Sequence, residues 1–192
     1  MLETTDTAEK LSDIQQYLPT EEFDFDLRRL GGARITWPTK SDTQAPLRRS
    51  AELLTASTER MQMFVAAYDQ LHAREVGELA RRTPTVEGIL TADVMEAVLA
   101  DPTIREGAIE YIEAGVEMYH YNSEASMTFG LFDGTVGFEL NDGSGFVPAF
   151  IETDDEAVLA WAEEAYEHHG REAERPMPTR SLPDSSIASR TR

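Results

Sequence analysis

Apolar residues along this chain alternate between the spacing of a helix and the spacing of a strand. Near the N-terminus, Leu11, Ile14 and Leu18 share one helical face, so we expect an amphipathic helix over residues 5–18 that ends at Pro19. Strands are expected at 33–37, 61–66, 85–90, 116–121, 127–132, 135–140 and 146–151. Further helices are expected at 46–55, 71–82, 91–99, 102–115 and from 153 onward. The chain therefore alternates strands with helices and then closes with a strand meander and a long helix.

Short polar signals mark the ends of these elements. The dipeptides Asp133-Gly134 and Asp142-Gly143 are typical of hairpin turns. Gly31-Gly32 is expected to break the connector that follows the first helix. The sequence Thr153-Asp154-Asp155-Glu156 reads as a capping box that opens the last helix.

The order of the elements favours an α/β fold, a mixed sheet with helices packed on both faces. The segment 61–66 is nearly continuously apolar, which suits a buried central strand. The strand at 127–132 is also apolar and leaves two interpretations open, burial in the core or an uncovered edge that pairs with another subunit. Ligands in open sheets of this kind bind beyond the carboxyl ends of the strands, which here carry 67–69, 91–93 and 121–123.

The charge balance changes what the protein can bind. Among 192 residues, 36 are acidic and 17 are basic, which gives a formal net charge of −19. Lys10 and Lys40 are the only lysines, and there is no cysteine. Acid spread along a chain with little lysine is typical of halophilic archaeal proteins, and such a surface repels phosphate backbones. We therefore expect no disulfide and no direct nucleic-acid binding by this chain.

No targeting or membrane segment is expected. No apolar run approaches the ~18 residues of a membrane span, and the acidic N-terminus lacks the order of a secretory signal. We expect a cytoplasmic protein without a membrane partner. Residues 176–192 are rich in proline, serine and arginine and are expected to form a disordered tail.

Three stretches of the chain resemble a known family. They are Tyr17 to Leu30, Gly88 to Val94 and Glu152 to Val158. In this order and spacing they are similar to haloarchaeal transcription regulators related to the methanogenesis and filament-growth regulator, and together they resemble that family's middle domain. The resemblance extends from about Leu11 to Glu174. It implies a phospholipase D-like fold, as in archaeal sugar-responsive regulators, and a role in effector sensing and subunit association.

Members of that family normally carry a winged helix-turn-helix before this domain. Only about 18 residues precede the connector here, so we expect the DNA-binding domain to be missing, either because the chain is an orphan sensor or because its start lies too far downstream. On this interpretation residues 1–30 are a helical linker remnant and residues 31–175 are an effector-sensing and dimerisation domain. The expected protein partner is a second copy or a related regulator.

Phospholipase D chemistry needs a histidine nucleophile, a lysine two residues later and an aspartate five residues after the lysine. Counting back from Asp133 places Thr128 at the lysine position and Ser126 at the histidine position. Neutral hydroxyls supply neither an imidazole nucleophile nor a fixed positive charge, so we expect no catalytic residue here. The hydroxyls could instead bind a polar ligand. The alternative interpretation is that these are ordinary strand residues followed by a turn.

The expected site takes a small polar effector and no cofactor or metal. Its predicted residues lie at strand ends or on the strand just described: Tyr68, Thr91, Asp93, Tyr121, Ser126, Thr128 and Asp133. His120 either lines this pocket or is partly buried and hydrogen-bonded. His168 and His169 lack a third ligand of strong spacing, which argues against a metal site.

Three classes of function remain open at this stage. The leading hypothesis is a non-enzymatic sensor and interaction domain. A divergent enzyme could use Asp69, Asp93 or Asp133 as a general base, although no set of nucleophile, base and orienting residue accompanies them. The third hypothesis is a purely structural dimerisation partner.

Overall fold

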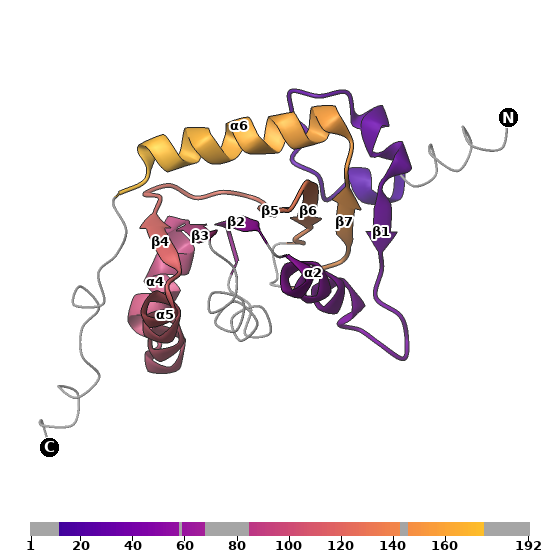
Figure 1. Ribbon diagram of the computed structural model, residues 1–192. Coiled ribbons are helices and arrows are strands. Elements are labelled where there is room, and N and C mark those ends of the chain that lie inside the picture. The colour runs from indigo at the N-terminus through magenta and orange to yellow at the C-terminus, as the bar shows by residue number, and fades with distance from the viewer. Residues whose placement is uncertain (1–11, 58, 68–84, 143–145, 175–192) are drawn as a thin grey trace, which may run out of the picture.

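The expected mixed sheet with helices on both faces is confirmed in the computed structural model (Figure 1). The structure describes residues 12–57, 59–67, 85–142 and 146–174. Within these residues the sheet has seven strands: β1 Arg34–Thr36, β2 Arg60–Val65, β3 Thr85–Leu90, β4 Glu117–His120, β5 Thr128–Phe132, β6 Thr135–Glu139 and β7 Phe150–Thr153. Their spatial order is β1-β7-β6-β5-β2-β3-β4. The expected helix at 71–82, the second hairpin glycine and the C-terminal tail lie outside the described residues.

The sheet combines a parallel half with an antiparallel half. β2, β3 and β4 are parallel, and β5 pairs antiparallel with β2 at the centre of the sheet. β6, β7 and β1 continue the antiparallel half. The interpretation of residues 127–132 as an edge is therefore wrong, because β5 has a neighbour on each side and all five of its residues are buried. The edges belong to β1 and β4 instead.

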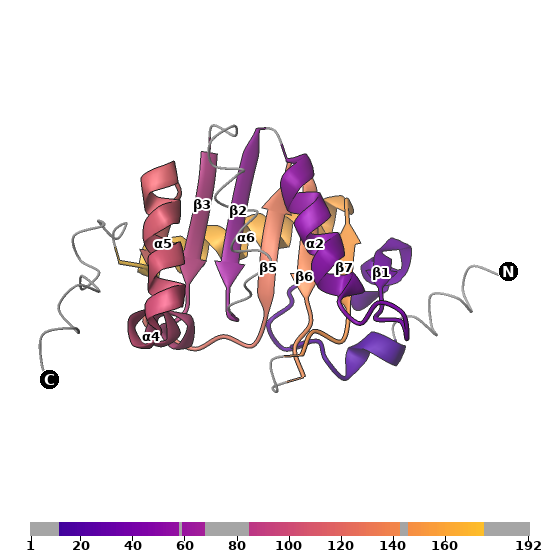
Figure 2. The same cartoon turned by 90° about the horizontal axis from the view of Figure 1, so that it is seen from below.

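Among the α-helices that the structure describes, three cover one face of the sheet and a fourth covers the other (Figures 1 and 2). The first face carries α2 Ala45–Ala56, α4 Ala92–Ala100 and α5 Pro102–Ala114, and the opposite face carries α6 Glu156–Glu172. The bounds of α5 follow from its ends. Asp101 accepts hydrogen bonds from the Thr103 and Ile104 N–H groups, and Gly115 ends the helix at φ 104°, in the left-handed region that favours glycine. The expected helix at 102–115 is confirmed.

Two boundaries near the last helix differ from the sequence prediction. Residues 146–149 are not part of the ladder, and β7 begins only at Phe150. Pro148 explains this, because proline has no N–H to donate to a neighbouring strand. The N-cap of α6 is Asp155, whose side chain accepts a hydrogen bond from the Ala157 N–H at 3.0 Å. Thr153 belongs to β7, so the capping-box interpretation of this segment is wrong.

The N-terminal connector packs on the same face as α6. Ile14 and Leu18, on the expected first helix, are 0% and 8% exposed and belong to the core beneath α6. The domain's own core therefore covers both residues, and they do not form an exposed apolar face. Leu11 lies outside the described residues. Gly31 and Gly32 do not break the connector but end a short 3-10 helix, η1 Leu27–Gly32.

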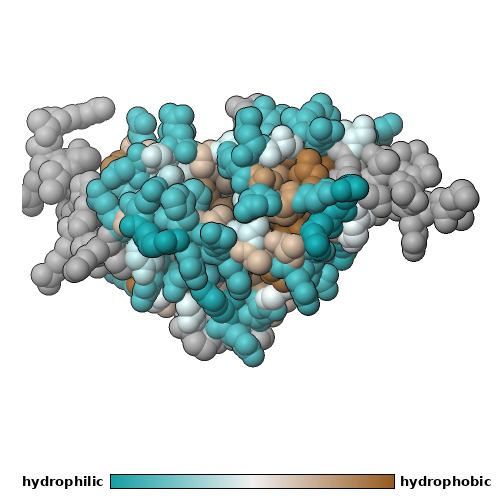
Figure 3. Space-filling model, turned by 90° about the horizontal axis from the view of Figure 1, so that it is seen from above, coloured by the Kyte–Doolittle hydropathy of each residue, from teal (hydrophilic) through white to brown (hydrophobic). Residues whose placement is uncertain are grey.

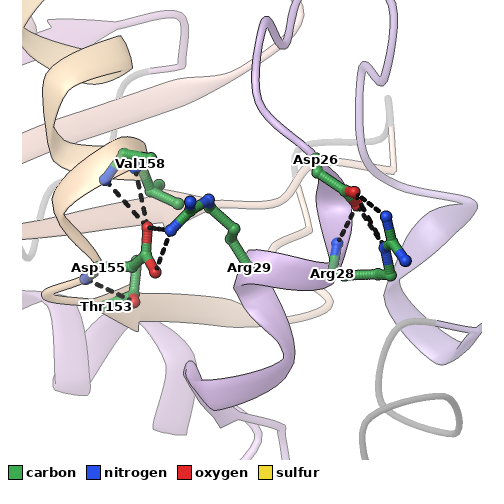
Figure 4. A network of polar contacts seen from close by, with 7 residues as sticks. Asp26, Arg28, Arg29, Thr153, Asp155 and Val158 are labelled. Carbon is green, nitrogen blue, oxygen red and sulfur yellow. Dashed lines mark hydrogen bonds and ion pairs between the residues drawn. The ribbon is translucent and has the colours of Figure 1, made fainter.

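One ion pair joins the connector to the start of α6, and a second lies within the connector (Figure 4). Arg29 donates to the Asp155 carboxylate at 3.2 Å, while Arg28 pairs with the neighbouring Asp26. Burial raises the pKa of Asp155, but the backbone N–H groups of Val158 and Ala157 and the Arg29 guanidinium outweigh it, so the pKa lies below its ordinary value. The cap of α6 therefore stays ionised at neutral pH and holds η1 against the helix.

The described helices include none that is long and apolar enough to cross a membrane. The longest, α6, has 17 residues and carries charged side chains along one side.

Candidate functional site

Four strands end along one border of the sheet, the site edge, where a ligand was expected. This border is formed by strand ends and is distinct from the edge strands β1 and β4. β2, β3 and β4 are parallel, so their carboxyl ends lie together, and the amino end of antiparallel β5 lies beside them. Backbone hydrogen bonds fix the segments that leave this edge. The Thr91 N–H donates to the Val65 carbonyl at 3.1 Å, and the Tyr121 N–H donates to the Leu90 carbonyl at 2.8 Å.

Four of the predicted site residues lie at this edge. Thr91 follows β3 and is 1% exposed, Tyr121 follows β4 and is half-buried, and Ser126 precedes β5 and is exposed. Thr128 begins β5 and is buried, and its hydroxyl accepts a hydrogen bond from the Ala66 N–H at 3.0 Å. The Thr128 hydroxyl thus ties β5 to the end of β2, which is a structural role.

Of the three remaining predicted residues, the structure places Asp133 away from these four. Asp93 is exposed in the first turn of α4, and Tyr68 lies outside the described residues. Asp133 lies at the opposite end of β5, roughly 16 Å along the strand from its start. There it forms the expected hairpin turn, with φ 45°, and its carboxylate accepts from the Glu59 and Arg60 N–H groups at 3.2 and 3.0 Å.

A cavity of about 440 Å³ lies next to the site edge, between α6, the sheet and the N-terminal connector. Its apolar lining comprises Phe64, Ala125, Met127, Phe129, Trp161 and Ala165. Its polar lining comprises Glu22, Asp24, Glu124, Glu164, His168, His169 and Arg171. None of the predicted site residues that the structure describes lines it, although Ala125 and Met127 are the chain neighbours of Ser126. The volume is in the range of roughly 300–1,000 Å³ that small-molecule pockets occupy.

The least exposed polar side chain of the lining is the imidazole of His169. Its ring stacks on Phe64 with centroids 4.2 Å apart, and Tyr121 meets both rings edge-on. Burial, followed by the charge of His168, lowers the pKa of His169, so the ring is neutral near pH 7. Its Nδ1 atom is buried and has no hydrogen-bond partner among the described residues. Buried polar atoms are normally paired, so this nitrogen is an exception among the described residues.

The connector forms one wall of the cavity. Glu22 accepts from the Ser126 hydroxyl at 2.6 Å through its side chain and from the Trp161 indole N–H at 3.1 Å through its carbonyl. Phe23 and Phe25 pack against the Trp161 ring, with centroids 5.0 and 5.5 Å away. Figure 3 shows this face of the molecule as mostly hydrophilic, with an apolar patch among the hydrophilic side chains. Hydrogen bonds and ring contacts therefore hold the connector to α6 and to the segment before β5.

The two adjacent histidines at the end of α6 do not form a metal centre in the described part of the chain. No group of three or more His, Asp or Glu side chains there is placed to hold a metal ion. His168 Nε2 lies 3.7 Å from Glu172, one helical turn further on, which is an ion pair when the histidine is protonated. His120 is half-buried and is not among the residues described around the cavity.

A comparison with protein families gives one match. The profile described as "Methanogenesis regulatory protein FilR1, middle domain" matches residues 43–172, which include every described strand except β1 and all four described α-helices. No curated protein sequence matches the chain.

The fold is shared with solved structures at low sequence identity. The chain is similar to TrmBL2, an archaeal chromatin protein whose structure shows a novel mode of DNA binding, at TM-score 0.54 and 14% identity over 90% of this chain. It covers only 64% of TrmBL2. It is also similar to the phospholipase D family member Nuc from Salmonella typhimurium, at TM-score 0.59 and 8% identity over 77% of this chain and 99% of Nuc. NucT from Helicobacter pylori gives TM-score 0.57 and 11% identity over 76% of this chain and 98% of NucT. The expected phospholipase D-like fold is confirmed.

Proposed function

Because this chain belongs to the family of the FilR1 middle domain, we propose that it is a regulatory domain that senses a small effector and does not catalyse a reaction. The observation that carries the proposal is the cavity beside the strand ends, which has the volume of a small-molecule pocket and a lining that is partly apolar and partly polar. A ligand there would contact α6, the sheet and the connector at once. Binding would therefore favour one arrangement of three elements, which is how a sensor domain changes its population of states.

Filling the cavity tests this proposal. Ala165 lies on α6 and lines the cavity, so Ala165→Phe should occupy its volume without adding charge. In a thermal-shift screen of small polar compounds at molar KCl, wild-type protein should give hits that raise the melting temperature. At a ligand concentration 100-fold above Kd, linkage gives about 2.7 kcal/mol of stabilisation, or a shift of roughly 5–10 °C for a domain of this size. The variant should lose that shift.

A matched control separates cavity filling from a general effect of a new aromatic ring. Ala100 is an exposed helical alanine at the end of α4, on the other face of the sheet. Ala100→Phe should keep the ligand response of the wild type. If every hit stabilises Ala165→Phe and the wild type equally, the effector does not bind in this cavity and the proposal is wrong.

We further propose that the phospholipase D-like fold carries no phosphodiesterase activity in this chain. Ser126 and Thr128 cannot act as a nucleophile and a phosphate-binding cation, and the Thr128 hydroxyl is buried against the Ala66 N–H. Glu22 hydrogen-bonds Ser126 and would repel a phosphate at that position. The purified protein should not hydrolyse a generic phosphodiester such as bis-p-nitrophenyl phosphate above the buffer rate. Reproducible turnover that Asp133→Asn abolishes would contradict this.

The remaining parts of the proposal concern partners. We propose that the domain associates with a second copy or a related regulator, that it does not bind DNA by itself, and that it acts in the cytoplasm. The acidic composition argues against direct phosphate contacts. The proposed association with another regulator is supported by the chain's membership of a family of regulatory proteins. The first helix adds no support for association, since its Ile14 and Leu18 are buried in the domain's own core.

A further inference from the structure

The carboxylates of the cavity indicate which ligand chemistry it accepts. Glu22, Asp24, Glu124 and Glu164 line it, against one guanidinium, Arg171. Elsewhere in the fold, acids at contacts between elements are paired with arginine, as Asp155 and Glu152 are. Among the described residues, no hydrogen bond or ion pair engages the side chains of three cavity acids: Asp24, Glu124 and Glu164. The cavity therefore presents unpaired acceptors to whatever enters it.

The positive groups around the cavity do not cancel this charge. Arg171 donates its Nε–H to the Glu167 carbonyl on its own helix at 3.1 Å. His168 is part of the lining but lies beside Glu172, which is not, and the Nδ1 atom of His169 is buried. An anionic ligand would have to approach three unpaired carboxylates, which costs free energy by like-charge repulsion.

The apolar wall of the cavity suits the hydrocarbon part of a ligand. Phe64 and Phe129 stack at 5.5 Å and Trp161 packs on Phe129 at 5.7 Å, so three aromatic rings form one cluster, of which Trp161 is the most exposed member. The face of an aromatic ring attracts a cation, most strongly for tryptophan. The apolar wall and the acidic rim, formed by Asp24, Glu124 and Glu164, together match a molecule with an apolar body and one positively charged head group.

We propose that the cavity binds a small organic amine, with its ammonium group at the carboxylates of Asp24, Glu124 and Glu164 and its apolar body against Phe64, Phe129 and Trp161. This rests on the proposed sensor function and names the ligand class of the same site. Glu164 is central to it, because this residue lies on α6 one turn after Trp161 and joins the acidic rim to the aromatic wall.

Three probes with similar bodies and different head groups test the charge preference. They are 2-phenylethylamine, 2-phenylethanol and 3-phenylpropionate, titrated into the full chain at molar KCl and followed by thermal shift and calorimetry. The amine should bind about tenfold more tightly than the alcohol, since a hydrogen bond between two charged groups is stronger than one between a carboxylate and a neutral hydroxyl. The carboxylate should bind most weakly of the three.

Two neighbouring glutamates provide a matched pair of variants. Glu164 lines the cavity, while Glu163 is exposed on the same helix and is not part of the lining. Glu164→Gln keeps the shape and helix preference of the residue but removes its charge, and it should abolish most of the amine's advantage over the alcohol. Glu163→Gln makes the same change in net charge and should leave that advantage unchanged.

The outcomes separate this inference from the function on which it rests. Equal or tighter binding of 3-phenylpropionate would overturn the amine assignment but leave a small-molecule sensor in place. An amine preference that Glu163→Gln reduces as much as Glu164→Gln would mean attraction to the acidic surface as a whole, and would also overturn the assignment. If no probe binds while Ala165→Phe removes the response to some other screened compound, the amine assignment fails and the sensor function stands.

Discussion

The melting temperature of this protein should fall by on the order of 10 °C when KCl is lowered from molar concentration to about 0.1 M. The cause is repulsion within one domain that carries a formal charge of −19. At 1 M salt the Debye length is about 3 Å and charges on neighbouring side chains are largely screened, whereas at 0.1 M it is about 10 Å. Differential scanning fluorimetry across a KCl series measures the effect.

A charge variant separates screening from other actions of salt. Glu106, Glu110 and Glu113 are exposed on α5 and are spaced three or four residues apart, so they repel one another on one helical face. Replacing all three by glutamine should raise the melting temperature at low salt and change it little at molar salt. A melting temperature that does not vary with KCl, or a gain of the triple variant that persists at molar salt, would contradict the electrostatic explanation.

Gly137→Ala should destabilise the fold by about 1–3 kcal/mol, the usual cost of overpacking a core. Gly137 in β6 lies directly opposite Gly130 in β5. A Cβ at position 137 would lie 2.5 Å from Cζ of Phe150, whose side chain is 1% exposed, and 3.2 Å from Cε2 of Phe132. Neither ring has free space into which it can move, because both are buried in the core. Chemical denaturation of the variant and the wild type measures the loss.

Gly88→Ala is the matched control for this substitution. Gly88 also lies inside a central strand, β3, but a Cβ there would meet nothing within 4 Å. Restricting the unfolded chain should make this change neutral or stabilising by up to about 1 kcal/mol. Adding Phe150→Leu to Gly137→Ala should recover part of the lost stability relative to the sum of the single changes. If both alanine variants lose the same free energy, the cost comes from the strand backbone and not from the phenylalanine rings.

The sequence predicted the elements well where their periodicity is local. Residues 85–90 are a strand as expected, and the α5 helix ends at Gly115 because its cap requires a positive φ. The hairpin at Asp133-Gly134 also follows from local preference, since both residues have positive φ. In each case the relevant interactions lie within a few residues of one another, so one sequence carries the information.

The sequence predicted the elements less well where their position depends on pairing with a strand that is distant along the chain. The position of β5 at the centre of the sheet depends on its pairing with β2, about 70 residues earlier. The choice of Asp155 over Thr153 as the cap of α6 depends on where β7 ends, and β7 is set by β1 and β6. An apolar strand pattern is compatible with either the centre or an edge, so the sequence alone left both open.

The candidate site shows the same division. The strand-end rule pointed to Thr91 and Tyr121, and the phospholipase D spacing pointed to Ser126 and Thr128. The structure brings all four to the same ends of β2, β3, β4 and β5. The cavity beside them was missed because its walls come from distant parts of the chain. The hydrogen bond between Glu22 and Trp161 spans 139 residues, and no sequence pattern signals it.

Trp161 allows the central claim, that a small effector binds in the cavity beneath α6, to be measured directly. Trp161 lines the cavity, and the only other tryptophan is Trp37, just after β1. In a Trp37→Phe background the fluorescence of the protein reports Trp161 alone. Titration of any compound that stabilises the protein should then change the Trp161 emission in a saturable manner, with the same Kd as the thermal shift. A stabilising compound that leaves this emission unchanged to saturation would contradict the account.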